Sequence, residues 1–237
     1  MSSYQGGKGA SGVAEQIINR MPKHRVYIET HLGSGRVLLK KKPANSSIAI
    51  ERDNKVLNAF KYSIAEYDGM NITLHNKDAV EYLKKAYLSK DVLIYSDPPY
   101  VMGTRKSQEP MYRYEYDDND HRELVAVLDS LDCFVMLSGY ESDLYDELLD
   151  SSKWHKFTFN AMTRQGVRRE ALWCNFDPDE YIKHDYSYMG ENFRERERIK
   201  RKSKRWINNL AKLPNDERNF LLSSISDNFG LELSNHL

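Results

Sequence analysis

Val92-Leu93-Ile94-Tyr95-Ser96-Asp97-Pro98-Pro99-Tyr100 joins a run of apolar residues to a stiff polar turn. The apolar run is typical of a buried strand. Each proline fixes its own φ, lacks a backbone N–H and holds the preceding residue extended. The Asp97 carboxylate and the Pro98 carbonyl can then point the same way and accept the two hydrogens of an amine, while the Tyr100 ring can stack on a flat group. A structural Pro-Pro turn that closes a strand is the alternative.

The rest of the chain predicts an α/β fold around this turn. Stretches with helical spacing of apolar residues alternate with the first five β-rich runs, which favours a mostly parallel sheet covered on both faces. The last two runs are joined only by residues 162–169, so we expect an antiparallel edge hairpin. The seven predicted strands are residues 25–29, 47–51, 71–75, 91–96, 132–138, 156–161 and 170–176.

Polar residues follow several of these strands at the end where open α/β sheets bind ligands. Gly33-Ser34-Gly35 forms a glycine turn after the first strand, which lets the backbone approach a ligand closely or serves only as a structural turn. Glu51 ends the second strand, where a carboxylate can accept both hydroxyls of a ribose, and Asp53 is a rival for that role. Asp78 follows the third strand and is interpreted either as an amine acceptor or as a helix N-cap.

The N-terminal segment Tyr4-Gln5-Gly6-Gly7-Lys8 is rich in glycine but is not a Walker A loop. Such a loop needs a preceding strand and a glycine five residues before its Gly-Lys pair, and position 2 is Ser. We interpret the segment as a glycine arm that delivers Lys8 to an anion such as an amino-acid carboxylate. A disordered N-terminus is the alternative.

Charge is balanced overall but segregated along the chain. The formal net charge is zero. Residues 194–205 hold eight basic residues against two acidic ones, whereas residues 109–150 hold thirteen acidic residues against two basic ones. The protein as a whole is therefore no polycation, and a nucleic-acid surface must come from local basic segments.

The composition limits the classes of protein to which the chain can belong. The two cysteines lie in apolar runs and predict reduced core residues, and the scattered histidines show no metal-ligand spacing, so no metal is expected. No apolar stretch is long enough to span a bilayer. We expect a soluble, cytoplasmic protein.

The sequence predicts three regions: a domain of residues 1–178, a linker over 179–192 and a basic helical extension over 193–237, which begins with a helix from 193 to 213. Basic residues in the extension, in the tyrosine-rich loop 101–118 and on the predicted hairpin turn are candidates for phosphate contact, although a solvated charged surface is the alternative. The candidates are Arg105, Lys106, Arg113, Arg164, Arg168, Arg198, Arg201, Lys202, Lys204 and Arg205.

Together these motifs resemble the Dam-like (D12 class) adenine-specific DNA methyltransferases, in particular compact members of the phage or prophage type. The resemblance spans about residues 4–176 and rests on the glycine arm, the turn from Glu29 to Gly35, the acidic end of the second strand, Asp97-Pro98-Pro99-Tyr100, and the hairpin that ends Glu170-Ala171-Leu172-Trp173. It implies a Rossmann-like class I methyltransferase fold that uses S-adenosylmethionine and no metal, with DNA as partner.

The resemblance also implies roles for individual residues. Asp97 and Pro98, with Pro99, would hold the N6 amine of a flipped adenine, and Tyr100 would stack on the base. The amine nitrogen would then take the methyl group in one in-line step. The implied cofactor-binding residues are Tyr4, Gly7, Lys8, Glu29, Leu32, Gly33, Ser34, Gly35, Glu51, Asp78 and Asp97.

One departure from the family concerns DNA recognition. Dam-type members carry a helical target-recognition insertion between the glycine turn and Asp-Pro-Pro-Tyr, whereas here two strands and two helices fill that interval. We therefore expect recognition to lie in residues 101–118 and in the helix from Phe193. Methylation of RNA adenine, of cytosine N4 or of a glutamine amide, and a non-catalytic nucleic-acid-binding protein on this scaffold, remain alternatives. Cytosine C5 methylation is disfavoured because both cysteines lie in predicted strands.

Overall fold

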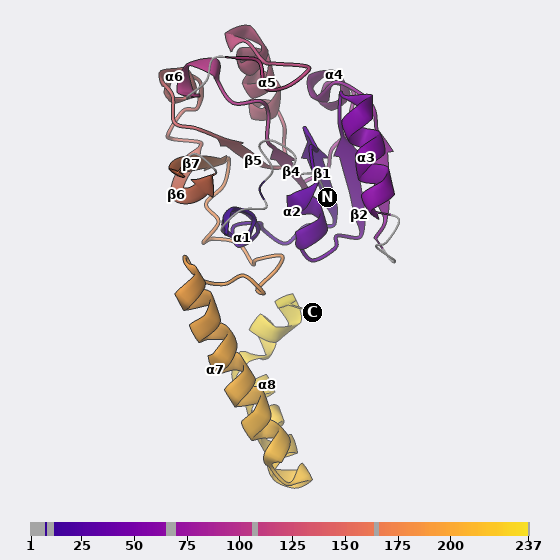
Figure 1. The fold of residues 1–237 in the computed structure, drawn as a ribbon. Coiled ribbons are helices and arrows are strands. Elements are labelled where there is room, and N and C mark those ends of the chain that lie inside the picture. The colour runs from indigo at the N-terminus through magenta and orange to yellow at the C-terminus, as the bar shows by residue number, and fades with distance from the viewer. Residues whose placement is uncertain (1–7, 9–11, 65–69, 106–108, 164–165, 237) are drawn as a thin grey trace. The chain divides into compact units, whose positions relative to one another are not determined.

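The computed structural model describes residues 8, 12–64, 70–105, 109–163 and 166–236, with the backbone alone for residues 162, 163 and 231–236. By its contacts the chain divides into two compact units, Met1–Asp185 and Tyr186–Leu237. Figure 1 shows the strands gathered in the first unit and the two longest helices in the second.

The first unit is built on a seven-stranded sheet in the order β3-β2-β1-β4-β5-β7-β6. The first five strands pair in parallel, and β7 pairs antiparallel to both β5 and β6. This architecture confirms the predicted α/β fold with an antiparallel edge hairpin. The strands are β1 (Val26–Thr30), β2 (Ser46–Ile50), β3 (Ile72–His75), β4 (Val92–Ser96), β5 (Phe134–Gly139), β6 (His155–Thr163) and β7 (Gly166–Cys174).

Helices cover both faces of the sheet. Alternate strand residues such as Ile28, Ile94 and Leu137 belong to one buried apolar cluster with residues of α4, α5 and α6. Because strand side chains alternate between faces, Tyr27 and Tyr95 belong to the opposite face, where the ammonium of Lys41, at the end of α2, lies 4.3 Å from the centre of the Tyr27 ring. The helices are α1 (Val13–Ile18), α2 (Arg36–Lys40), α3 (Asn54–Ile64), α4 (Ala79–Leu83), α5 (Asp118–Asp129) and α6 (Asp143–Leu148), with a 3₁₀ turn η1 (Met102–Thr104).

The edge hairpin is longer than the sequence predicts. Ladder pairing of β6 with β7 continues from His155↔Cys174 to Thr163↔Gly166, so most of the predicted loop 162–169 is strand. Arg168 therefore lies on β7, and its placement on the hairpin turn was wrong. The sequence pattern did not predict this extension, because the outer part of the hairpin is exposed and polar and lacks the apolar run that is typical of a buried strand.

The first unit ends later than the predicted domain boundary at residue 178. His24 stacks on His184 with ring centroids 3.8 Å apart, and Asp185 accepts a hydrogen bond from the Lys42 backbone N–H at 3.0 Å. Residues 179–185 of the predicted linker are thus part of the sheet unit.

The second unit contains α7 (Phe193–Lys212) and α8 (Asn215–His236), which is kinked at Phe229. The Asn192 side chain caps α7 by accepting a hydrogen bond from the Glu195 N–H at 3.0 Å. The predicted helix over 193–213 is thus present. Most described side chains of α7 and α8 are exposed.

Candidate active site at the strand ends

Three neighbouring strands bring the predicted site residues together. Thr30, the last residue of β1, is in register with Ile50 of β2 and with Ser96 of β4. The glycine turn, Glu51 and Asp97 follow these three positions directly. They therefore share one edge of the sheet, the carboxyl end at which α/β sheets bind ligands.

The glycine turn has a tightly specified backbone. Gly33 and Gly35 have φ values of 52° and 61°, a region that glycine enters without steric cost. A Cβ added to Gly35 would lie 2.2 Å from the Phe60 ring of α3, so this position has a packing reason to be glycine. His31 also has a positive φ of 58°, and its Nε2 lies 2.8 Å from the Tyr116 hydroxyl. Leu32 is buried, and Ser34 lies between the two glycines.

Glu51 is fixed against this turn. One carboxylate oxygen accepts from the Gly33 N–H at 3.0 Å and the other from the Asp53 N–H at 2.8 Å. Burial raises the pKa of Glu51, although these backbone hydrogen bonds oppose that rise. The two donors hold the carboxylate in one orientation and leave it free to accept further hydrogen bonds, which fits a site for ribose hydroxyls.

Asp78 caps α4 by accepting from the backbone N–H groups of Val80 and Glu81 at 2.9 and 3.1 Å. Of the two interpretations left open by the sequence, the N-cap is therefore realised. The second carboxylate oxygen lies 3.6 Å from the Arg52 guanidinium.

The buried Glu29 side chain has a structural role that the sequence did not indicate. Its carboxylate accepts from the Tyr27 hydroxyl at 2.8 Å and from the Leu38 backbone, which ties β1 to α2. Glu29 is only 3% exposed. Burial is the main cause that raises the pKa of Glu29 to about 8, and the negative charge of Asp97 adds to it.

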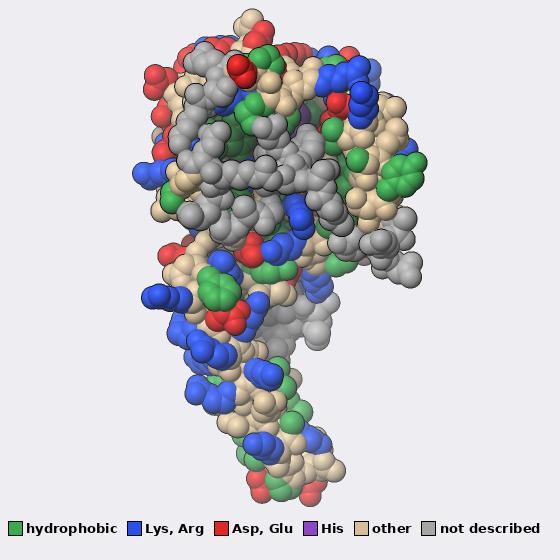
Figure 2. Space-filling model, viewed as in Figure 1, with side chains coloured by type: hydrophobic (Ala, Val, Ile, Leu, Met, Phe, Trp, Pro, Cys, Tyr) green, Lys and Arg blue, Asp and Glu red, His purple; other side chains and the backbone are tan. Residues whose placement is uncertain are grey.

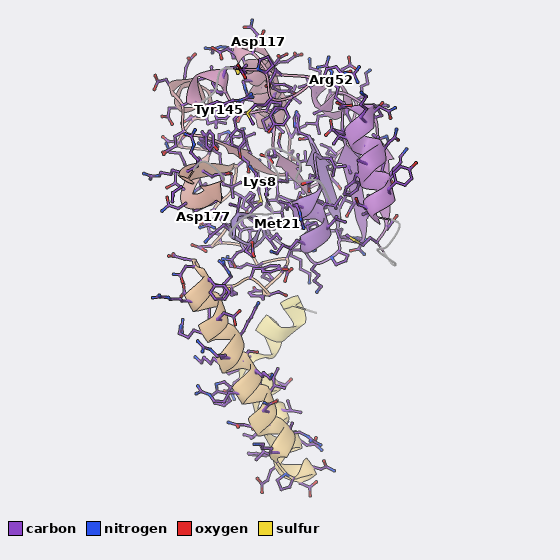
Figure 3. All side chains as sticks on the ribbon, in the orientation of Figure 1. Lys8, Met21, Arg52, Asp117, Tyr145 and Asp177 are labelled. Atoms are coloured by element: carbon purple, nitrogen blue, oxygen red, sulfur yellow. The ribbon has the colours of Figure 1, made fainter. Side chains whose placement is uncertain are left out.

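The Asp97 turn lies against Lys8. The Lys8 ammonium is 2.9 Å from Asp97 Oδ1, so it is the charged partner of this buried carboxylate. Lys8 also contacts the Tyr100 hydroxyl and lies 4.5 Å from the centre of the Tyr100 ring. Figure 3 shows Lys8 in the interior of the sheet unit.

A fourth residue, Glu170 of β7, completes this cluster. Its Oε2 accepts from Lys8 at 3.0 Å and from the Tyr100 hydroxyl at 2.8 Å. Sequence reasoning quoted Glu170 within the hairpin motif but gave it no role. The available signal was a single carboxylate that opens the apolar run Ala171-Leu172-Trp173.

Burial and charge shift the titration of this cluster. Burial raises the pKa of Asp97, and the nearby Lys8 ammonium partly offsets that rise. Burial and the carboxylates of Glu170 and Asp97 raise the pKa of Tyr100, which keeps its hydroxyl protonated as a donor. Burial would lower the pKa of Lys8, but Asp97 and Glu170 outweigh it and raise that pKa.

The Tyr140 ring contacts both Tyr100 and a basic residue on β7. The Tyr140 ring meets the Tyr100 ring edge to face at 4.5 Å, and the Arg168 guanidinium lies 5.6 Å from the centre of the Tyr140 ring. Arg168 thus remains close to the turn although it lies on a strand.

The predicted nucleic-acid residues of loop 101–118 are less suited to DNA than the sequence indicates. Arg105 forms a bidentate pair with Glu115 at 3.0 and 2.7 Å, and its side chain is only 5% exposed, so its proposed phosphate contact is not supported. Arg113 is exposed and lies 3.8 Å from Asp53. The adjoining open pocket, which is acidic and unsuited to a polyanion, is lined by Met102, Glu115, Tyr116, Asp117, Asp118, Asn119 and Asp120.

Basic side chains of the second unit remain open to solvent. Arg198, Arg201, Lys202, Lys204 and Arg205 are exposed on α7, and Figure 2 shows basic side chains along this unit. The nearest acidic partner of Arg198 is Glu195 at 3.5 Å.

Four predicted site residues, Tyr4, Gly7, Lys106 and Arg164, lie outside the described residues. Within the described ranges, no group of three His, Cys, Asp or Glu side chains could hold a metal ion. In that same part of the chain, no helix is long and apolar enough to cross a membrane.

The fold is similar to solved methyltransferase structures at low identity. SMU.1697c from Streptococcus mutans, a proposed methyltransferase in complex with SAH, aligns with a TM-score of 0.50 and 11% identity over 68% of this chain and 95% of its own. An rRNA methylase from Streptococcus thermophilus aligns with a TM-score of 0.47 and 11% identity over 68% and 93%. At 11% identity, the similarity to SMU.1697c shows a shared fold alone. No curated protein matches the chain.

The sheet order is that of the Rossmann-like fold found in solved methyltransferases. Residues 51–165 match the family described as D12 class N6 adenine-specific DNA methyltransferase. The matched region contains Glu51 and the complete Asp97 turn, and it confirms the family resemblance that the sequence motifs carry.

Proposed function

We propose that this protein transfers a methyl group from S-adenosylmethionine to N6 of adenine in DNA. The observation that carries the proposal is the Asp97 turn at the end of β4, whose buried carboxylate holds a cationic nitrogen donor, the Lys8 ammonium, 2.9 Å from Oδ1. A buried carboxylate needs a hydrogen-bond donor, and a ligand that enters this position has to supply one. An exocyclic amine of a base has the matching hydrogens.

The chain's own residues would bind and orient this amine. Asp97 and the Pro98 carbonyl accept its two hydrogens, which fixes the direction of the nitrogen lone pair. The Tyr100 ring stacks on the base once it has left the duplex, as access to a base edge requires. The buried position excludes water from the acceptors and strengthens these contacts.

The residues present fit the cofactor that the fold implies. Glu51, held by two backbone donors beside the glycine turn, would take the ribose hydroxyls, and the turn from Leu32 to Gly35 would line the site next to it. Asp78 and Lys8 would border the same edge. When bound, S-adenosylmethionine supplies an electrophilic methyl group.

DNA contact is proposed for the exposed basic residues. Five of these residues lie on α7 and two lie in the sheet unit. They are Arg198, Arg201, Lys202, Lys204 and Arg205 of α7, with Arg113 and Arg168 of the sheet unit. Such residues would supply most of the affinity through phosphate contacts that are independent of sequence. Residues 1–185 would be the catalytic unit and the basic C-terminal unit would help to hold the duplex.

The substrate class is tested by offering labelled S-adenosylmethionine with matched duplex DNA, single-stranded DNA and RNA, followed by nucleoside analysis. N6-methyladenine in DNA above the level in RNA supports the proposal. Greater incorporation into RNA, or N4-methylcytosine as product, would redirect it to another amine. DNA binding without cofactor binding in calorimetry would indicate a non-catalytic binding protein.

A further inference from the structure

Glu170 contacts two residues of the amine-binding cluster from a distant part of the chain. Its Oε2 lies 3.0 Å from the Lys8 ammonium and 2.8 Å from the Tyr100 hydroxyl. The residue is 7% exposed, so both contacts are shielded from solvent. A carboxylate in such a position is expensive to bury unless its partners require it.

Two carboxylates share the single ammonium group of Lys8. Asp97 Oδ1 and Glu170 Oε2 lie 2.9 and 3.0 Å from its Nζ. With all three groups ionised, the cluster carries a net charge of −1, since one positive charge meets two negative charges. The neutral pair of Lys8 with Asp97 would already balance, so Glu170 is an additional charge that packing alone does not explain.

The two carboxylates have different roles in the proposed function. Asp97 must offer its oxygens to the substrate amine, and the Lys8 ammonium occupies the space beside Oδ1 in this structure. An amine that enters this position weakens the pairing of Lys8 with Asp97. A buried ammonium then needs another carboxylate, because an unpaired buried charge is strongly destabilising.

We propose that Glu170 is a positioning residue that retains Lys8 when the substrate amine takes Asp97. Lys8 thus holds the position beside Asp97 that the amine takes, and it moves its main pairing to Glu170 during substrate binding. Glu170 also accepts from the Tyr100 hydroxyl and so holds the stacking ring in place. This inference rests on the proposed function for the identity of the amine, but the pairing of Lys8 with Glu170 does not.

The kinetic test is a double-mutant cycle. Glu170→Gln keeps the side-chain shape and removes the charge, and we expect turnover to fall at least about tenfold, the scale for losing a charged hydrogen-bond partner. If Glu170 acts through Lys8, the same change made in a Lys8→Met protein lowers turnover by less than about threefold further. Glu141→Gln is the matched control, because Glu141 pairs with Lys156 and Arg169 outside the cluster.

A second measurement does not depend on methylation. Acetylation of Lys8 by an amine-reactive reagent at pH 9, followed by mass spectrometry, reports how strongly the ammonium form is held. Glu170→Gln removes one of the two carboxylates that raise the pKa of Lys8, so we expect acetylation to be at least about fivefold faster than in the wild type and in Glu141→Gln. Thermal unfolding of each variant checks that the fold persists.

The outcomes separate the two proposals. Unchanged Lys8 acetylation in folded Glu170→Gln protein overturns the role of Glu170, as does a loss of turnover that is fully additive with Lys8→Met. Faster Lys8 acetylation in a protein that transfers no methyl group to DNA supports the pairing and overturns only the proposed substrate.

Discussion

The Glu170 carboxylate and the Lys8 ammonium lie 3.0 Å apart although 162 positions separate them in the sequence. Lys8 precedes the first helix of the sheet unit, and Glu170 lies on its last strand. The cluster at the Asp97 turn therefore combines residues from the beginning and the end of the sequence of the sheet unit. It follows that the site is complete only when β7 has paired with β5.

Replacement of Glu51 tests the ribose-binding role. In Glu51→Gln the amide NH₂ cannot accept, so either the Gly33 or the Asp53 N–H loses its partner. We expect the dissociation constant for S-adenosylmethionine to rise about tenfold or more and stability to fall by about 1–3 kcal/mol. Calorimetric titration and thermal unfolding measure the two effects, with Asp53→Asn for comparison. Wild-type affinity in Glu51→Gln would remove Glu51 from the cofactor site.

The stability of the protein should depend on pH through Glu29. Burial raises the pKa of Glu29 to about 8 in the folded state, from its ordinary value of 4.5. The protonated form thus stabilises the fold, fully below about pH 4.5, and this contribution is lost as the pH rises toward 8. Chemical unfolding across this range should show a steeper loss for the wild type than for Glu29→Gln. Glu81→Gln, an exposed control, should follow the wild type; parallel wild-type and Glu29→Gln curves would argue against a protonated Glu29.

Removal of basic residues from α7 tests the proposed DNA contact. Each lost phosphate contact reduces the slope of log affinity against log salt by about 0.9, so four substitutions reduce it by up to about 3.6. Fluorescence anisotropy over a salt series measures the slope. The four changes are Arg201→Gln, Lys202→Gln, Lys204→Gln and Arg205→Gln.

A matched control for α7 removes four exposed lysines from the sheet unit and should leave the slope nearly unchanged. Equal slopes for the wild type and the α7 variant would instead indicate an ordinary solvated helix. The control substitutions are Lys77→Gln, Lys84→Gln, Lys85→Gln and Lys90→Gln.

Two substitutions of Tyr100 separate its ring from its hydroxyl. Tyr100→Ala removes a stacking surface worth about 1–3 kcal/mol per base, so kcat/KM for DNA should fall about tenfold or more. Tyr100→Phe keeps the ring and loses the contacts of the hydroxyl with Glu170 and Lys8, and it should retain more activity than Tyr100→Ala. Steady-state kinetics with DNA gives both values. Identical losses in the two variants would exclude stacking as the main role of the ring.

Much of the fold could be predicted because its strands are local and apolar. All seven strands were expected near their observed positions, and the pairing of the last two as a hairpin is confirmed. Helix α6 and the turn η1 were not predicted, since α6 is only 6 residues long and lies within an acidic segment. Short helices depend on tertiary packing rather than on a sequence pattern.

The site was harder to predict where it depends on long-range contacts. Asp97, Glu51 and the glycine turn follow strands, so their common edge could be inferred from topology. Glu170 and the pairing of Arg105 with Glu115 could not, because neither contact has a local signature. From the sequence alone, a charged residue in a loop is expected to be exposed, because the sequence does not show its partner.

The most direct test of the central claim compares transfer of labelled methyl from S-adenosylmethionine to unmethylated duplex DNA by the wild type and by Asp97→Ala. Removing one preorganised acceptor at a reacting centre should lower turnover about a hundredfold or more, with N6-methyladenine as the wild-type product. Asp132→Ala, at an exposed position, is the control and should match the wild type. Wild-type turnover in a folded Asp97→Ala protein would contradict the assignment of the Asp97 turn as the amine-binding site.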